Sequence, residues 1–281
     1  MVGHGAPISN VFSTQFLTLT WHSLFGAIAV FAAVYCTDRW GQQVGFRKGI
    51  VADVALWAVI SGLIGARIVA VADDWTFYSQ NPLDILKVWQ GGIAIYGAFA
   101  GGVIGGSVYA FLKRYPVRYL LDLAAPSLVL AQAIGRIGDI INGDHYSTPS
   151  HLPWAVVYTN PASPGRFGPY GPLTPTHPAV AYELLAGVAA FGLLLFLRGR
   201  LKPAGALFAV TAALYAGIRL AFSFIRLDSH SHILGLNQQG FISVVVLAGA
   251  FLTLVLLRPR FGPRDCHPPA GFQEATEARP T

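Results

Sequence analysis

The chain has 281 residues, of which 54% are hydrophobic and only 11% are charged, and its mean hydropathy is +0.53. Soluble domains carry about 25% charged residues, so this composition excludes a soluble globular protein and predicts a multi-pass membrane protein. The formal net charge of +6 fits basic cytoplasmic loops and does not call for nucleic acid, and two cysteines are too few for a disulfide framework or a thiolate zinc site.

Apolar runs recur along the chain. A helix that crosses a membrane needs about 20 mostly apolar residues, and on that criterion we predict an all-α protein with about seven transmembrane helices in a single domain over 1–260. In chain order the predicted spans are 19–37, 49–72, 92–112, 119–141, 178–197, 204–225 and 240–257. No basic residue precedes the first run, so we expect it to be retained as a span and not cleaved as a signal peptide.

Basic residues gather after the first, third, fifth and seventh predicted spans. They are Arg39, Arg47, Lys48, Lys113, Arg114, Arg118, Arg198, Arg200, Lys202, Arg258, Arg260 and Arg264. Because cytoplasmic loops carry an excess of Lys and Arg, we expect the N-terminus outside and the C-terminus in the cytoplasm. The polar, proline-rich segment 261–281 is predicted to be a disordered cytoplasmic tail.

The connection 144–176 is long for a compact protein and rich in proline and glycine. Its run "WAVVY", at 154–158, combines β-branched and aromatic residues, as strands do. Long loops are usually functional or disordered, and we expect this one to form a small extracytoplasmic head containing short strands.

Several ionisable side chains lie inside the predicted spans, where an ionised group costs roughly 2.5–3.5 kcal/mol on insertion scales. The predicted orientation places one group of them at the outer ends of the spans: Arg67, Tyr96, Arg136, Asp139, Glu183 and Arg219. Any single one of these could reach the interface and pair with a neighbour. Several arginines at one depth favour an anionic headgroup, because a planar guanidinium binds phosphate through two parallel hydrogen bonds.

Two other patterns have alternative interpretations. The runs "SGLIGAR" (61–67) and "GGIAIYGAFAGGVIGG" (91–106) lack the lysine of a nucleotide loop, and small residues at helical spacing favour close helix packing in lipid. Loop histidines and aspartates raise a metal-site alternative, but they form no HExxH pair and we expect no metal. These residues are His145, His151, His177, His230, His232, Asp144 and Asp228.

Seven blocks follow one another in collinear order within residues 21–247. They read "GLIGAR", "NPLDILKVWQGGIAIYGAFAGG", "DLAAPSLVLAQAIGRIGDIINGD", "LPWAVVY", "THPAVAYE", "LYAGIR" and "NQQGFIS". Together they resemble the prolipoprotein diacylglyceryl transferase family. The resemblance implies seven helices with a periplasmic head, and transfer of the diacylglyceryl group of phosphatidylglycerol to the lipobox cysteine of a prolipoprotein signal peptide. It places the chain in the bacterial cytoplasmic (inner) membrane, with glycerol phosphate as the leaving group and no metal or soluble cofactor.

The resemblance also implies roles for individual residues. It assigns Arg136, Arg219, His177 and Glu183 to catalysis, and Arg67 and Tyr215 to substrate binding. The family signature GRxGNFxNxExxG is changed here: Asp139 replaces its Asn, Ile140 its Phe, Asp144 its Glu and Ser147 its last Gly, while Asn142 is kept. Three further positions differ: Tyr96 replaces the proposed catalytic histidine, Phe25 an early aromatic and Ser223 an acidic residue. A divergent paralogue that binds or transports an anionic lipid, or modifies another acceptor, stays open as an alternative.

Thioether formation requires a thiolate to attack a glycerol carbon, and a positive field lowers the thiol pKa from about 8.5. We expect Arg136 and Arg219 to bind the phosphate and stabilise its growing charge. Asp139 is expected to pair with Arg136 and restrain it, and His177 to accept the thiol proton. Tyrosine phenols are poor proton acceptors near neutral pH, so we expect Tyr96 to orient the headgroup. Asn142 and Asp144 are expected to contact substrate.

Overall fold

The computed structural model describes residues 10–13, 18–87, 94–161, 163–227, 232–233, 236–265 and 267. The chain folds into two compact units. The first holds Met1–Tyr35 and Leu121–Cys266, and the second holds Cys36–Leu120 and His267–Thr281. The single domain expected over 1–260 stays a prediction.

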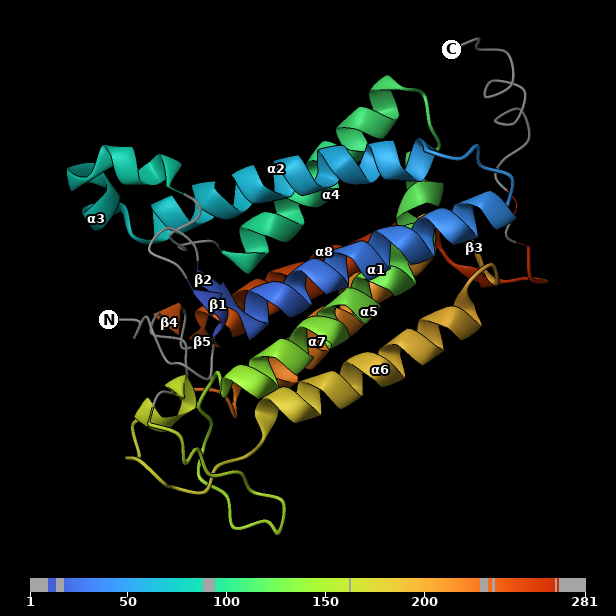
Figure 1. Cartoon of the computed structure of the whole chain (residues 1–281). Coiled ribbons are helices and arrows are strands. Elements are labelled where there is room, and N and C mark those ends of the chain that lie inside the picture. Colours follow the sequence, from blue (N-terminus) through green and yellow to red (C-terminus); the bar gives the residue numbers. More distant parts are fainter. Residues whose placement is uncertain are drawn as a thin grey trace. The chain divides into compact units, whose positions relative to one another are not determined.

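Long helices make up most of the described chain (Figure 1). They are α1 (Trp21–Gln43), α2 (Ile50–Asp73), α4 (Ile95–Leu112), α5 (Val117–Asn142), α6 (Ala179–Leu197), α7 (Ala206–Ser223) and α8 (Gln238–Leu257). The shorter elements are α3 (Trp75–Gln80), the 3-10 helices η1 (Pro82–Leu86) and η3 (Pro164–Phe167), and the strands β1 (Asn10–Ser13), β2 (Thr18–Thr20), β3 (Leu201–Lys202), β4 (His232–Ile233), β5 (Leu236–Asn237) and β6 (Arg260–Phe261). Among the described residues these strands pair antiparallel, β1 with β2, β3 with β6 and β4 with β5. The mostly helical fold is as predicted.

Six of the described helices are long and apolar enough to cross a membrane: α2, α4, α5, α6, α7 and α8. This result confirms a multi-pass membrane protein. The first predicted span became α1, which is not among the six. Polar residues occupy both ends of α1, so its apolar run covers only 24–36, short of the roughly 20 residues that a span needs. The seventh span and the orientation therefore stay predictions.

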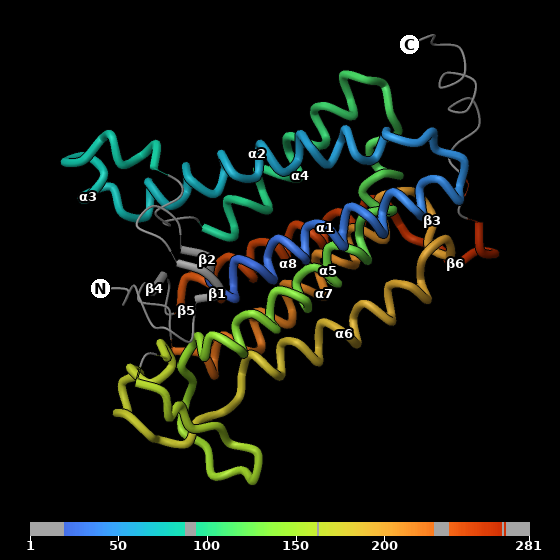
Figure 2. The backbone as a smooth tube through the Cα atoms, viewed as in Figure 1, coloured from blue at the N-terminus to red at the C-terminus, as the bar shows by residue number. Residues whose placement is uncertain are grey.

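The connection between α5 and α6 contains almost no regular structure (Figure 2). The strand expected at 154–158 is reduced to one isolated bridge, in which Val156 and Thr176 exchange two backbone hydrogen bonds of 2.9 Å. Prolines at 153 and 161 flank the run and cannot donate to a ladder. The named strands all lie outside this connection, so a head with short strands stays unconfirmed. The predicted tail, 261–281, lies mostly outside the described residues, although Phe261 belongs to β6.

Glycines bring α2 and α4 together in the second unit. A Cβ atom added at Gly65 would lie 2.4 Å from the Gly97 carbonyl oxygen, and one added at Gly97 would lie 2.3 Å from the Gly65 oxygen. A Cβ at Gly101 would meet the Ser61 oxygen at 2.4 Å. In lipid, small residues allow such close approach of helix backbones. The interpretation of the two glycine runs as packing faces is therefore confirmed.

Replacing Gly65 by alanine should separate α2 from α4, because the obstructing atom is a backbone oxygen that cannot move aside. Overpacking of this kind typically costs about 1–3 kcal/mol. We expect a clearly lower midpoint of thermal denaturation for Gly65→Ala in detergent micelles. Gly192→Ala is the matched control, because nothing lies within 4 Å of its Cβ. An unchanged midpoint for Gly65→Ala would contradict the packing described here.

The core of the first unit lies between α5, α6 and α7. Its buried residues are Ala125, Val129, Ala190, Leu194, Leu197 and Leu207. Near one end, the Asp122 carboxylate accepts hydrogen bonds from the backbone N–H groups of Gly205 and Phe208, at 2.7 and 2.8 Å, and so caps the start of α7. Because α5 and α7 start together and α6 runs back between them, the last turns of α5 and α7 meet the first turns of α6 at the other end of the core.

Candidate active site

A single buried carboxylate, that of Glu183 in α6, holds three arginines together. It accepts from Arg136 Nη2 at 2.5 Å, from Arg219 Nη1 at 3.1 Å and from Arg226 Nη1 at 2.9 Å. The side chains of Glu183, Arg219 and Arg226 are at most 5% exposed, and that of Arg136 is 14% exposed. We call these four residues the arginine cluster. Because it combines three guanidinium groups with one carboxylate at a buried site, the arginine cluster has a strong positive field.

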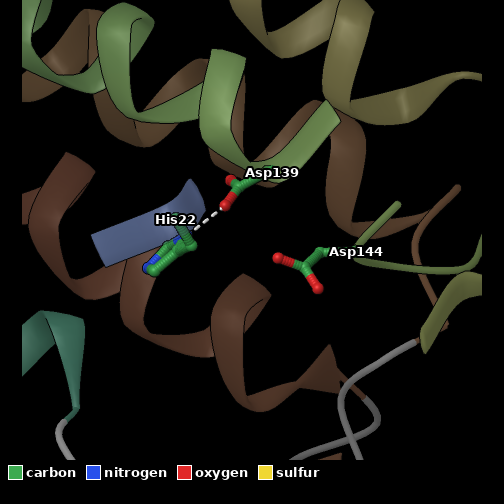
Figure 3. A group of neighbouring side chains, drawn as sticks. All are labelled: His22, Asp139 and Asp144. Atoms are coloured by element: carbon green, nitrogen blue, oxygen red, sulfur yellow. Dashed lines mark hydrogen bonds and ion pairs between the residues drawn. The ribbon is translucent and has the colours of Figure 1, made fainter. Parts of the chain in front are cut away.

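Asp139 extends the cluster toward α1. It lies one turn after Arg136 in α5, so both side chains share one helix face. Asp139 Oδ2 accepts from Arg136 Nη1 at 2.7 Å, and Oδ1 pairs with His22 Nδ1 from the first turn of α1. The Asp139 carboxylate is only 3% exposed, whereas the His22 side chain is 62% exposed. Figure 3 shows His22 and Asp139 joined, with Asp144 beside them.

His145, in the connection after α5, is bound from two sides. Arg226 Nη2 lies 2.9 Å from His145 Nδ1, and since a guanidinium only donates, Nδ1 must accept. The ring proton then sits on Nε2, which lies 3.9 Å from Asp139 Oδ2. The His145 ring therefore lies between Arg226 of the arginine cluster and Asp139.

α8 supplies a further contact to the cluster. The amide oxygen of Gln239, in the first turn, accepts from Arg219 Nη2 at 2.8 Å. This turn is fixed by Asn237, whose side chain accepts from the Gly240 N–H at 2.7 Å and donates to the Ser223 carbonyl at 2.7 Å. The end of α7 and the start of α8 are thus tied together around Arg219.

A narrow cavity lies between α5, α6 and α7, next to the arginine cluster. It is lined by Val129, Gln132, Ala133, Arg136, Glu183, Gly187, Ala190, Tyr215, Ile218 and Arg219. One end is apolar and the other is polar. The Tyr215 hydroxyl donates to Gln132 Oε1 at 3.5 Å across it. An apolar slot that ends at guanidinium groups suits a molecule with an acyl chain and an anionic headgroup.

The structure brings together most of the residues predicted from the sequence. Arg136, Asp139, Glu183 and Arg219 are in direct contact, and Tyr215 lines the same cavity. The expected pairing of Asp139 with Arg136 is confirmed; their roles with substrate stay predictions.

Asn142 and Asp144 lie at the edge of this group. Asn142 Nδ2 donates to Asp144 Oδ2 at 3.1 Å. Burial raises the pKa of the Asp144 carboxyl, which lies in the connection after α5. One potential metal-ligand atom from each of Asp144, Asp139 and His22 lies within 4.8 Å of the other two. Asp144 is therefore close to the Asp139 pair, and its predicted contact with substrate stays a prediction.

His177, Arg67 and Tyr96 have different surroundings. The His177 ring lies 6.2 Å from that of Tyr182, and its Nδ1 is buried without a hydrogen-bond partner among the described residues. Arg67 and Tyr96 belong to the second unit. Arg67 is 7% exposed, donates to the backbone oxygens of Asp84 and Ile85 in η1, and lies 5.0 Å from the Tyr78 ring centre. These contacts give Arg67 a structural task, and the predicted substrate roles of all three residues stay predictions.

Sequence reasoning missed three members of the site: Arg226, Gln239 and His22. Arg226 lies beyond the end of α7 and reads as a loop cation, yet it is only 4% exposed and bound to Glu183. Its spacing of seven residues from Arg219, about two helical turns, was the available signal. Gln239 lies in the quoted block "NQQGFIS". His22 carried no signal, because its meeting with Asp139 depends on how α1 packs against Gly138.

Comparison with known proteins shows the family of the chain. The family model described as prolipoprotein diacylglyceryl transferase matches residues 9–256. A protein of Thermosynechococcus vestitus named phosphatidylglycerol–prolipoprotein diacylglyceryl transferase is 34% identical over 219 residues, covering 76% of this chain and 80% of its own length. Proteins with that name from Trichormus variabilis and Dehalococcoides mccartyi are 36% and 34% identical, covering 85% and 84% of this chain and 84% and 88% of their own lengths. The chain belongs to the prolipoprotein diacylglyceryl transferase family.

Proposed function

We propose that this chain transfers the diacylglyceryl group of phosphatidylglycerol to the lipobox cysteine of a prolipoprotein signal peptide. The arginine cluster at the polar end of an apolar slot carries this proposal, together with the family of the chain. Phosphatidylglycerol has one phosphate charge and two acyl chains, so headgroup and chain would each meet a matching part of the cavity. The enzyme needs no cofactor, because the phosphate ester is itself the leaving group.

The reaction is a substitution at carbon. The thiol loses its proton, and a sulfur electron pair forms a bond to the glyceryl carbon. The bond from that carbon to the phosphate oxygen breaks, and its electron pair stays on the oxygen. Glycerol phosphate leaves with one more negative charge than the phosphate had in the lipid, and the thiol proton balances that charge.

Arg136 and Arg219 act on the charge that develops in this step. Both line the cavity, and both are held in place by Glu183, so their donors need no reorganisation as the phosphate gains charge. Arg226 adds positive charge through its contact with Glu183 Oε1 at 2.9 Å. The same field favours the thiolate over the thiol. Tyr215, which lines the same cavity, completes the proposed headgroup contacts through its hydroxyl group.

The orientation follows from the basic residues. We propose a seventh span in α1, an outer N-terminus and a cytoplasmic C-terminus, in the bacterial cytoplasmic membrane. A cysteine placed at His151 should then react with an impermeant thiol reagent in intact cells, and one placed at Lys202 should not, in a background without the native cysteines. Both positions are exposed. Labelling at position 202 alone would reverse the orientation.

Complementation tests the proposed activity. A bacterium depleted of its own transferase should grow when this chain is expressed, and its prolipoprotein should shift to the lipidated form on a gel. The alternative is a protein that binds or transports an anionic lipid without transferring it. Correct membrane insertion with no lipidated prolipoprotein would support that alternative and contradict the proposal.

A further inference from the structure

The proposed transfer releases a proton from the cysteine thiol, and a group in the site has to receive it. The guanidinium groups of the arginine cluster stay protonated at any physiological pH and cannot do so. The Glu183 carboxylate is enclosed by those three groups. A histidine with a free ring nitrogen is the side chain best suited to the task near neutral pH.

Two of the described histidines near the site are poorly placed for this step. His145 Nδ1 accepts from Arg226, so the ring proton lies on Nε2 and the ring is a donor there. His177 Nδ1 is buried without a partner, and its ring contact is with Tyr182, not with a carboxylate. Neither ring has both an orienting acid and an open nitrogen.

His22 has both. Its Nδ1 pairs with the Asp139 carboxylate, which is 3% exposed and fixed in turn by Arg136 at 2.7 Å. Figure 3 shows the contact between His22 and Asp139. Because an ionised carboxylate accepts, it holds the ring proton on Nδ1 and leaves the lone pair on Nε2. The ring as a whole is 62% exposed, so a second substrate can reach it. Asp139 would also stabilise the imidazolium that forms when the ring takes up a proton.

We propose that His22, oriented by Asp139, is the general base that removes the thiol proton of the acceptor cysteine. This inference rests on the proposed function. The proton moves from sulfur to His22 Nε2, and the sulfur electron pair then forms the bond to the glyceryl carbon. The electron pair of the broken carbon–oxygen bond leaves with glycerol phosphate. His22 returns the proton to that phosphate or to water, so the enzyme ends the cycle unchanged.

Asp139 gains a second task in this account. From the sequence alone it is expected to restrain Arg136; through His22 it also positions the base. These two tasks predict opposite results for Asp139→Asn. Release of a restraint would raise activity, whereas an amide that can donate to Nδ1 favours the wrong ring tautomer and lowers kcat.

The rate should depend on pH through the ring. Among the residues that the structure describes, the charged and titratable groups near His22 are Asp139 and Arg136 from α5 and Asp144 from the connection that follows. When the pH falls below the pKa of the His22 imidazole, the ring is protonated and cannot accept the thiol proton. In that range kcat should fall about tenfold for each pH unit. The variant His22→Gln should lose this acid limb, because glutamine does not titrate.

The test is a lipidation assay with purified full-length chain in vesicles of phosphatidylglycerol and a synthetic lipobox peptide. Wild type should transfer lipid, His22→Gln should reduce kcat about 10²-fold or more with KM for lipid unchanged, and added imidazole should restore part of the rate in His22→Ala. Asp139→Asn should reduce kcat, whereas release of a restraint on Arg136 would raise it. Gln132→Ala, a cavity variant without a proposed proton role, should keep the acid limb of the wild-type pH profile.

The outcomes separate the two proposals. An inactive wild type would contradict the proposed function. If the wild type is active and His22→Gln keeps its full kcat and its pH profile, the role of His22 is contradicted and the proposed function is not. Loss of wild-type activity on treatment with EDTA would make His22, Asp139 and Asp144 metal ligands, since their donor atoms lie within 4.8 Å of one another, and would also overturn the role as a base.

Discussion

Replacing Glu183 by glutamine is expected to remove lipidation and to destabilise the protein by several kcal/mol. The substitution leaves Arg136, Arg219 and Arg226 close together around a neutral amide. Breaking a buried ion pair by removing one partner typically costs about 3–5 kcal/mol, because the remaining charge is left uncompensated. Here three guanidinium groups share the one carboxylate, so we expect the upper part of that range.

The control for this variant is Asp122→Asn. Asp122 is also a carboxylate within α5, but it accepts from backbone N–H groups at the start of α7, at the other end of the core. Loss of a cap typically costs about 1 kcal/mol, and lipidation should continue. Thermal denaturation in detergent and the lipidation assay, run on both variants, measure the difference. A Glu183→Gln protein with wild-type stability and activity would show that the arginine cluster does not depend on its carboxylate.

Replacing Arg136 is expected to have the largest effect on turnover with an intact fold. Its side chain is 14% exposed, more than those of Arg219 and Arg226, so it is the member of the cluster most open to the cavity. Removal of one preorganised donor typically costs about 10²–10³ in kcat, and we expect that loss in Arg136→Ala. Arg136→Lys keeps the charge but loses the two-bond geometry, so it should also be strongly impaired.

Arg200→Ala is the matched control, because Arg200 lies just beyond the far end of α6 and donates to the Phe196 carbonyl at 2.7 Å. It should lipidate at the wild-type rate. Binding of phosphatidylglycerol vesicles and initial rates of lipidation, measured on all three variants, separate loss of affinity from loss of turnover. Full turnover in Arg136→Ala would remove this residue from the mechanism.

Helix spacing explains why the centre of the site could be predicted. Helices in a multi-pass protein alternate in direction, and each residue advances about 1.5 Å along the axis. Arg136 near the end of α5, Glu183 near the start of α6 and Arg219 near the end of α7 were therefore expected at one depth, and they are in contact. The glycine runs were equally informative, since close packing of α2 on α4 needs only small residues at helical spacing.

The remainder of the site depends on tertiary packing that no periodicity encodes. Arg226 follows the last turn of α7, and whether it faces solvent or Glu183 is decided by how the chain turns there. His22 reaches Asp139 only because α1 packs on the glycine at position 138, where a Cβ would lie 3.0 Å from the His22 Cα. The isolated bridge at Val156 likewise depends on a partner, Thr176, that lies 20 residues away. Residues 154–158 have a propensity for strand, but the flanking prolines limit the pairing to this one bridge.

The proposed transfer fixes the stoichiometry of its two products, glycerol phosphate and lipidated peptide. Purified chain is incubated with phosphatidylglycerol labelled in its headgroup phosphate and with a lipobox peptide, and both released glycerol phosphate and thioether-linked peptide are counted. We expect one glycerol phosphate to be released for each peptide lipidated, no release when the peptide cysteine is replaced by serine, and loss of both products in Arg136→Ala. Binding of phosphatidylglycerol without release of glycerol phosphate in the presence of the thiol peptide would contradict the proposed transfer.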